Sequence, residues 1–267
     1  MLRVLDLFSG IGGFSLGLER TGGFKTVAFC EIDPFCQRVL HKHWKGAQIH
    51  EDIRGLTRHM LRGVLPIHVI CAGFPCQDIS LAADAPAGVF GERSGLWQSV
   101  IRLLCDFRDA GDPLPLLILE NVSALLHRGL DVILAELAAI GYDAEWHCIP
   151  ASAVGAPHPR DRLWIVAYTP EMFGAEFGRD KSRRLLSPDG LLSFVYDEGR
   201  ENHFAAWRAT ESELDRTLHG VSDRVDRLGA LSNSVVPQIP ELIGNAILQS
   251  MCLKSAPAEK LLTGDGK

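Results

Sequence analysis

The chain has 267 residues, of which 46% are hydrophobic, with a formal net charge of −6 and a pI near 5.9. This length suits one large domain with a full core, or a catalytic domain with a small appendage. No apolar run approaches the roughly 18 residues that span a bilayer, and the N-terminus lacks a signal-peptide pattern, so we expect a cytoplasmic protein. The acidic balance does not itself indicate a nucleic-acid partner, so nucleic-acid binding would have to depend on local sites.

The cysteines form neither a CxxC pair nor a Cys/His spacing typical of zinc sites, so we expect no metal. The seven are Cys30, Cys36, Cys71, Cys76, Cys105, Cys148 and Cys252. Most lie in apolar runs, which is typical of small buried hydrophobic residues. Cys76 differs, because it stands between Pro75 and Gln77 at the end of such a run.

A strand, a glycine-rich turn and a helix are predicted at the N-terminus. Leu2–Phe8 is a short apolar run, followed by SGIGG and the helical pattern FSLGLERTG. Such a unit opens a doubly wound α/β sheet. Gly10, Gly12 and Gly13 allow the backbone to approach a ligand and to pack helix on strand. The spacing is not GxGxxG and no Walker lysine follows, which disfavours a phosphate-binding loop.

Two acidic residues follow the next apolar segments. Thr26–Ile32 is predicted as a second strand ending at Glu31, and Asp33-Pro34 begins a helix. A carboxylate there can accept hydrogen bonds from the two ribose hydroxyls of an adenosine, the alternative being a surface acid at a strand end. Asp52, in HEDIR, stands where an adenine amino group could be bound, with a simple turn acid as the alternative.

Ile67–Phe74 is predicted as a buried strand that leads directly into Pro75-Cys76-Gln77. The segment Asp78–Arg93 is rich in Ala, Gly, Asp and Pro, and we predict a long loop that acts as a lid. Ser94–Ala110 has apolar residues at helical spacing and is predicted as a helix.

The next buried strand, Pro115–Leu119, ends at Glu120-Asn121-Val122. Ligand sites of α/β sheets form at the carboxyl ends of parallel strands, so Glu120 is a candidate site residue. Gly129–Ile140 is predicted as an amphipathic helix.

Tyr142–Ile149 and Leu163–Tyr168 are predicted as a closing pair of strands. Between them, GAPHPRDR contains Arg160 and Arg162. On a strand, residues two apart would project from one face.

The composition shifts to dense, mixed charge at 170–227, which predicts a small irregular lobe. Its arginines and aromatic residues fit either nucleic-acid contact or a solvated, salt-bridged insertion. The predicted organisation is a catalytic domain at 1–169, this lobe at 170–227, a C-terminal helix at 228–253 that returns to the catalytic domain, and a disordered tail at 254–267.

The motifs, in this order, resemble those of the cytosine-C5 DNA methyltransferase family. They are DLFSGIGG, EIDP, EDI, AGFPCQDIS, RSGLW, ENV, PRDR and LSNSVVPQ, and only Pro170–Arg227 is left without a match. The resemblance implies the class I S-adenosylmethionine-dependent methyltransferase fold, Rossmann-like and doubly wound, with 170–227 as a target-recognition region. It departs from the family at three positions: His158 stands in place of Gln, Ser232 in place of Gly, and Glu51 in place of Gly.

By resemblance, S-adenosyl-L-methionine is the cofactor, and twelve residues would bind it. They are Phe8, Gly10, Ile11 and Gly13 in the turn, Glu31 at the ribose, Ile32, Asp52 and Ile53 at the adenine, and Pro75, Leu96, Asn233 and Ser234 at the methionine end.

The resemblance also implies the catalytic residues. The Cys76 thiolate would add to C6 of cytosine, with Glu120 at N3 and Arg162 at O2. Arg160 or Arg162 would favour the thiolate, and Asn121 would hold the loop and the base.

The implied substrate is double-stranded DNA from which the target cytosine is flipped out, with Ser80–Arg93 closing over it. We expect a monomer of bacterial or phage-like type that acts in restriction–modification. Two alternatives remain open, namely an RNA cytosine-C5 methyltransferase and a catalytically inactive homologue that binds DNA or cofactor.

Overall fold

The computed structural model describes residues 1–75, 95–156, 158, 160–173, 185–186, 230–231 and 233–255. The predicted lid at Asp78–Arg93 and nearly all of the lobe at 170–227 lie outside these residues. Within the described ranges, no helix is both long and apolar enough to cross a membrane.

In the described part of the chain, seven strands form one sheet in the order β3-β2-β1-β4-β5-β7-β6. They are β1 (Leu2–Leu7), β2 (Phe24–Cys30), β3 (Gln48–His50), β4 (Val69–Ala72), β5 (Leu116–Val122), β6 (Asp143–Pro150) and β7 (Asp161–Tyr168). β1 to β5 pair in parallel, whereas β7 is antiparallel to both β5 and β6. The predicted α/β sheet with a closing pair of strands is therefore confirmed.

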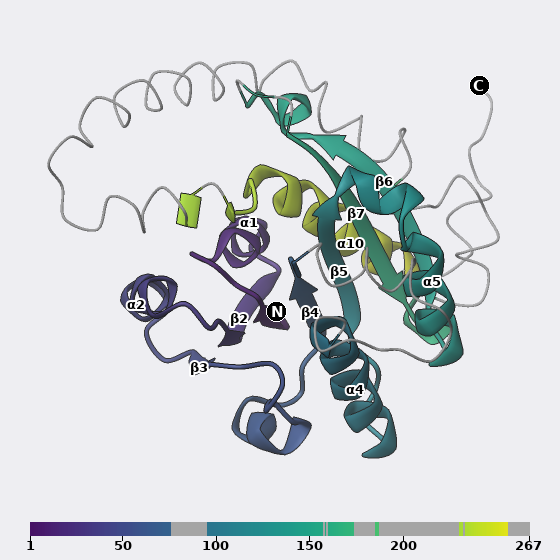
Figure 1. The fold of residues 1–267 in the computed structure, drawn as a ribbon. Helices are drawn as coiled ribbons and strands as arrows, with labels where there is room; N and C mark the ends of the chain where they lie inside the picture. Colours follow the sequence, from purple (N-terminus) through teal and green to yellow (C-terminus); the bar gives the residue numbers. More distant parts are fainter. Residues whose placement is uncertain are drawn as a thin grey trace, which may run out of the picture.

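Helices cover both faces of the sheet (Figure 1). The α-helices are α1 (Gly13–Arg20), α2 (Pro34–His43), α4 (Gly95–Asp109), α5 (Leu130–Ala139), α6 (Pro170–Phe173) and α10 (Gln238–Ser255); the 3₁₀ helices are η1 (Arg58–Val64), η2 (Ser123–His127) and η3 (Ala151–Val154). The helices predicted at Ser94–Ala110 and Gly129–Ile140 are confirmed as α4 and α5. α10 ends at Ser255, two residues past the predicted end at 253.

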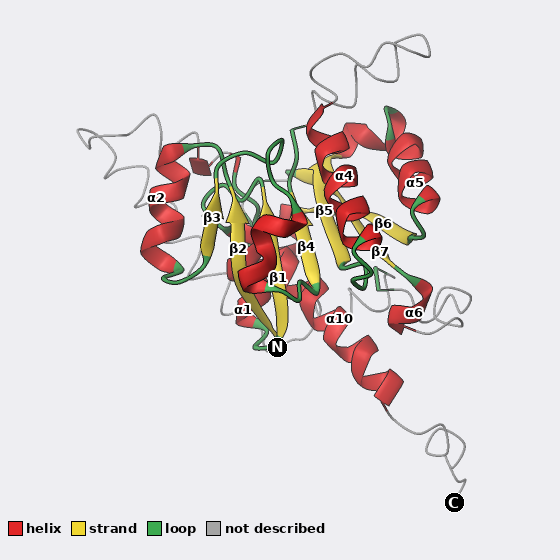
Figure 2. Cartoon of the chain, turned by 90° about the horizontal axis from the view of Figure 1, so that it is seen from below, coloured by secondary structure: helices red, strands yellow, loops and turns green. Residues whose placement is uncertain are grey.

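Alternate residues of the central strands face two separate cores. On β5, Leu117 and Leu119 pack in the core that contains α4 and α5, whereas Leu116 and Ile118 pack in the core that contains α1 and α10. Both sides of each strand are apolar because a parallel sheet is covered on both faces. Figure 2 shows the strands side by side, with α2 at the side of β3 and α5 at the side of β6.

α10 packs directly on α1 through glycines. A Cβ on Gly17 of α1 would collide with the carbonyl oxygen of Pro237. A Cβ on Gly244 of α10 would lie 3.0 Å from Cδ2 of Leu18. These contacts bring the segment before α10 alongside the glycine-rich turn that follows β1.

Candidate functional site

One edge of the sheet collects the residues that follow the strands. The parallel strands β1 to β5 end at the same edge, and β7, which runs the opposite way, begins there. Glu120 on β5 and Arg162 on β7 therefore lie at the same edge as the turn after β1. From β1, the strands β2 and β3 are added on one side and β4 and β5 on the other, so the strand order reverses between β1 and β4. Sheets of α/β proteins bind ligands at such a switch point.

The turn after β1 has an unusual backbone. Phe8 and Gly10 both have a φ of 53°, and Gly12 has a φ of 87°. A non-glycine residue in this region is strained, and such strain gathers at ligand sites. A Cβ on Gly10 would meet no atom within 4 Å, whereas one on Gly13 would lie 2.5 Å from the carbonyl oxygen of Val235. Packing against Val235 therefore excludes a side chain at Gly13, whereas Gly10 leaves open space beside the turn.

Glu31 holds this turn from the end of β2. Its carboxylate accepts the backbone N–H of Gly10 at 2.6 Å and that of Asp33 at 2.8 Å. Glu31 is 9% exposed, so the alternative of a surface acid is wrong. Each carboxylate oxygen keeps a second lone pair for a hydroxyl donor. Ile11, next to Gly10, is half-buried.

The residues expected to contact an adenine differ in exposure and in their partners. Ile32 is 64% exposed, an unusual value for a large apolar side chain beside a buried acid, whereas Ile53 is buried in the core. The Asp52 carboxylate is paired with Arg54, whose Nη2 lies 2.7 Å from Oδ2. The hydrogen bond from the Arg54 side chain lowers the pKa of Asp52 most, and the bond from the Arg54 backbone lowers it further. This acid therefore stays ionised. Glu51 is exposed.

Glu120 and Arg162 form an ion pair at the ends of β5 and β7. Nε of Arg162 lies 2.9 Å from Oε1 of Glu120, and both side chains are mostly buried. A Cβ on Gly73 would lie 3.5 Å from Oε2 of Glu120, so the carboxyl group borders the segment that leads from β4 to Cys76. Burial raises the pKa of Glu120, and this effect outweighs the opposing ones of Arg162 and Arg160. The group therefore holds a proton more readily than an exposed glutamate does.

Asn121 faces the other side of β5 and binds the same segment. Its Nδ2 donates to the carbonyl oxygen of Phe74 at 3.0 Å, and its Oδ1 accepts the N–H of Val122 at 2.8 Å. The residue is 3% exposed, and both polar atoms of its buried amide group have hydrogen-bond partners. Asn121 thus fixes the backbone two residues before Cys76, while Pro75 is exposed.

Arg160 lies just before β7 and Arg162 lies within it, so the condition under which both would project from one strand face is not met. β7 begins at Asp161, and Arg160 precedes it with a φ of 30°, which breaks the alternation of a strand. Nη2 of Arg160 donates to the carbonyl oxygen of Ser234 at 3.1 Å, whereas Arg162 pairs with Glu120. Burial, followed by the charge of Arg162, lowers the pKa of Arg160.

The segment before α10 reaches the glycine-rich turn. Oγ of Ser234 would lie 3.2 Å from a Cβ on Gly13, and Asn233 is exposed beside it. Leu96, at the start of α4, is half-buried and packs against the core of that face. His158 is half-buried. Cys76, Ser232 and the Ser80–Arg93 loop lie outside the described residues.

Asp6 is a fully buried acid beneath the turn, and the motifs do not single it out. Its Oδ2 accepts hydrogen bonds from the Ser15 hydroxyl group at 2.6 Å and from the Ser15 backbone N–H at 3.3 Å. Its Oδ1 has no partner in the described part of the chain. Burial raises the pKa of Asp6 to about 7, with smaller contributions from Glu31 and Glu19. The available signal was an acid inside an apolar strand.

We expect Asp6 to make folding stability depend on pH. The folded pKa of about 7 exceeds the unfolded value, so from about pH 4 to 7 the folded state binds a proton that the unfolded chain lacks. The free energy of unfolding should therefore fall as the pH rises through this window. Asp6→Asn should remove this part of the slope in urea unfolding series. Equal slopes for variant and wild type would contradict the assignment.

A family model described as C-5 cytosine-specific DNA methylase matches residues 2–184. The Type II methyltransferase M2.BsuMI of Bacillus subtilis is 34% identical over 170 residues, which are 62% of this chain and 42% of that protein. M.Sau3AI of Staphylococcus aureus, also a Type II methyltransferase, is 31% identical over 240 residues, or 83% of this chain and 56% of that protein. The chain thus spans about half the length of these curated relatives.

Among solved structures, a mutant of Spodoptera frugiperda DNMT2 aligns with a TM-score of 0.52 at 19% identity, over 63% of this chain and 50% of that one. Schizosaccharomyces pombe Dnmt2 gives a TM-score of 0.50 at 20% identity, over 63% and 49%. At these identities the likeness shows the fold alone, the Rossmann-like fold of S-adenosylmethionine-dependent methyltransferases, as predicted. Because the family model covers more than half of it, the chain belongs to the C-5 cytosine-specific DNA methylase family.

Proposed function

We propose that this chain is a DNA (cytosine-5-)-methyltransferase that uses S-adenosylmethionine. The observation that carries the proposal is the Glu120–Arg162 pair, 2.9 Å apart at the sheet edge and beside the segment that enters Cys76. An acid, a cation and a thiol are the groups that cytosine needs for reaction at C5. The glycine-rich turn with Glu31 lies at the same edge, so cofactor and base can meet there.

The cysteine makes C5 reactive. C5 of cytosine is a poor nucleophile, but addition of the Cys76 thiolate to C6 breaks the conjugation of the ring and gives an enamine. Electron density then moves to N3 and O2. Glu120 donates its proton at N3, and the Arg162 guanidinium binds O2. The raised pKa of Glu120 suits this role, because a carboxyl group must be protonated to donate.

The later steps restore the cytosine ring. When bound, S-adenosylmethionine would supply an electrophilic methyl group and leave as S-adenosylhomocysteine. After C5 is methylated, a base removes the C5 proton, the C6–sulfur bond breaks, and Cys76 leaves as the thiolate. N3 returns its proton to Glu120, and the product is 5-methylcytosine. Asn121 takes no proton in this scheme; it holds the backbone at Phe74 so that Cys76 stays aligned.

The described residues fit the adenosyl cofactor. Gly10 faces open space, Glu31 keeps free lone pairs for ribose hydroxyls, and the exposed Ile32 offers an apolar surface for an adenine ring. We propose that Asp52 binds the adenine amino group. Phe8, Ile11, Gly13 and Ile53 would line the adenosine side, and Pro75, Leu96, Asn233 and Ser234 the methionine side.

We further propose duplex DNA as the substrate, with the base flipped out at a cost of a few kcal/mol. The region 170–227 would contact the DNA, and its small size favours a short or degenerate target site. Bisulfite sequencing of DNA from cells that express the protein tests this, and a long, strict motif would contradict it. We propose a monomer that acts in the cytoplasm within a restriction–modification system.

Purified protein with methyl-tritiated S-adenosylmethionine tests the reaction itself. We expect label in duplex DNA, recovered as 5-methylcytosine after digestion to nucleosides. Label in transfer RNA alone would favour the RNA enzyme. Cofactor binding without transfer to either nucleic acid would favour the inactive homologue.

A further inference from the structure

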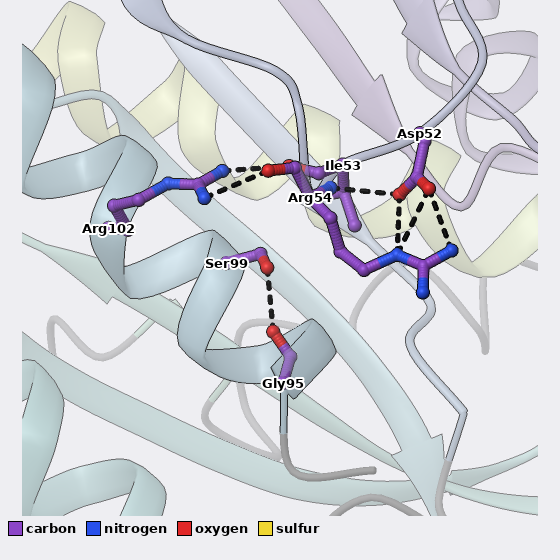
Figure 3. Close-up of polar contacts among 6 residues, drawn as sticks. All are labelled: Asp52, Ile53, Arg54, Gly95, Ser99 and Arg102. Carbon is purple, nitrogen blue, oxygen red and sulfur yellow. Dashed lines mark hydrogen bonds and ion pairs between the residues drawn. The ribbon is translucent and has the colours of Figure 1, made fainter. Parts of the chain in front are cut away.

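Arg102 of α4 binds the turn that follows β3 through backbone carbonyl groups, and Figure 3 draws its contacts with Ile53 and Arg54. Its Nη1 donates to the carbonyl oxygen of Arg54 at 2.9 Å. Its Nη2 donates to those of Ile53 at 2.9 Å and Leu56 at 3.2 Å. One planar guanidinium group thus joins three carbonyl groups of one turn, which a lysine ammonium cannot reproduce with the same geometry.

The same turn sets the direction of the Asp52 carboxylate. Oδ1 of Asp52 accepts the backbone N–H of Arg54 at 2.9 Å, and the Arg54 side chain pairs with both carboxylate oxygens. The turn is closed by bonds from Gly55 to Asp52 and from Leu56 to Ile53, each 3.2 Å long. Arg54 therefore links the two residues. Its side chain and backbone N–H donate to Asp52, and its carbonyl oxygen accepts from Arg102.

α4 is a firm support for this contact. Trp97, Val100, Leu103 and Leu104 are all buried in the core on this face of the sheet. The hydroxyl group of Ser99 donates a hydrogen bond to the carbonyl oxygen of Gly95 at 2.6 Å, within the first turn of the helix. Arg102 thus reaches the turn from a helix whose own position is fixed by packing.

We propose that Arg102 is a positioning residue for the adenine end of the cofactor site. By holding the carbonyl groups of Ile53 and Arg54, it fixes Asp52 in the direction that distinguishes an amino group from a carbonyl group on the purine. A carboxylate accepts from an amino group and repels a carbonyl oxygen, so this selectivity depends on its direction. The inference rests on the proposed function, because it takes Asp52 as the adenine-binding acid.

The test is calorimetric titration with S-adenosylhomocysteine and S-inosylhomocysteine, which differ at the 6-position of the purine. In wild type, we expect the adenosyl ligand to bind at least about tenfold more tightly, the value of one good hydrogen bond. In Arg102→Ala, we expect its affinity to fall about tenfold while that of the inosyl ligand changes little, so the selectivity is lost. The KM for S-adenosylmethionine should rise, with kcat at saturation within about twofold of wild type.

Two further variants separate positioning from general stability. Arg58→Ala is the matched control, because Arg58 makes bidentate contacts of 2.6 and 3.0 Å with Asp112 beyond the end of α4 and does not involve the Asp52 turn. It should leave the selectivity unchanged. Arg102→Lys keeps the charge and should fold if the alanine variant does not, yet it should also lose most of the selectivity. In an Asp52→Ala background, Arg102→Ala should have no further effect on selectivity.

Unchanged selectivity in both Arg102 variants would overturn the inference, as would an equal loss of affinity for the two ligands. Failure of the wild-type protein to bind S-adenosylhomocysteine at all would overturn the proposed function, and the inference with it. If the wild type selects the adenosyl ligand and both Arg102 variants select it equally well, the inference alone is overturned.

Discussion

Cys76→Ala is expected to abolish methyl transfer to DNA while S-adenosylhomocysteine binds with nearly wild-type affinity. Without the thiolate there is no addition to C6, and C5 stays too poor a nucleophile to accept a methyl group. The cofactor residues at the turn after β1 belong to other strands and do not depend on this side chain. Tritium transfer and calorimetric titration measure the two quantities separately.

The control for this variant is Cys105→Ala, which removes a free cysteine on α4. It should retain activity. DNA with 5-fluorocytosine at the target should trap a covalent adduct with wild type, because fluorine at C5 blocks the final elimination, and no adduct with the alanine variant. Equal loss of transfer and cofactor binding in Cys76→Ala would show that its role is misassigned, and an active enzyme that forms no adduct would exclude the covalent mechanism.

Glu120→Gln should lower kcat about 10²- to 10⁴-fold, the range of general acid catalysis. The amide keeps the shape of the carboxyl group and can donate a hydrogen bond to N3, but it cannot transfer a proton. It also removes the charge that Arg162 pairs with at 2.9 Å. Single-turnover methylation measures the chemical step without interference from product release.

The pH profile distinguishes this role from a structural one. Burial raises the pKa of Glu120, and the reaction needs its protonated form, so kcat should decline as the pH rises through that pKa. This alkaline decline should disappear in Glu120→Gln. Glu145→Gln is the control, because Glu145 accepts a hydrogen bond from the hydroxyl group of Tyr168 at the opposite end of β7 from Arg162. A variant that keeps both the wild-type kcat and the alkaline decline would remove Glu120 from the mechanism.

Local sequence features predicted much of the fold because they act over a few residues. Asp33 accepts the N–H groups of Phe35 and Cys36 at the start of α2, with Pro34 in the first helical position, so the predicted helix start is confirmed. The apolar runs became the buried strands of a sheet covered on both faces. The order of motifs along the chain likewise predicted the family, which the family model confirms.

Local sequence patterns could not predict contacts between segments that are distant along the chain. Arg160 and Arg162 are two residues apart, but a backbone turn before β7 sends Arg160 to Ser234, 74 residues away, and leaves Arg162 with Glu120. The spacing of two predicts a shared face only inside a strand, and whether the strand includes Arg160 depends on its tertiary partners.

The amino-acid order alone specifies which chemical groups this chain carries, namely a glycine-rich turn, acids after two strands, a Pro-Cys-Gln segment and an arginine pair. The contacts that support these groups arise from packing. Asn121 binds the Phe74 carbonyl group, Arg102 binds the turn after Asp52, and Ser15 binds Asp6 beneath the glycines. The reason is physical. A side chain's partner across the core depends on how strands and helices pack, and burial, which also shifts the pKa values of Asp6 and Glu120, exists only after that packing.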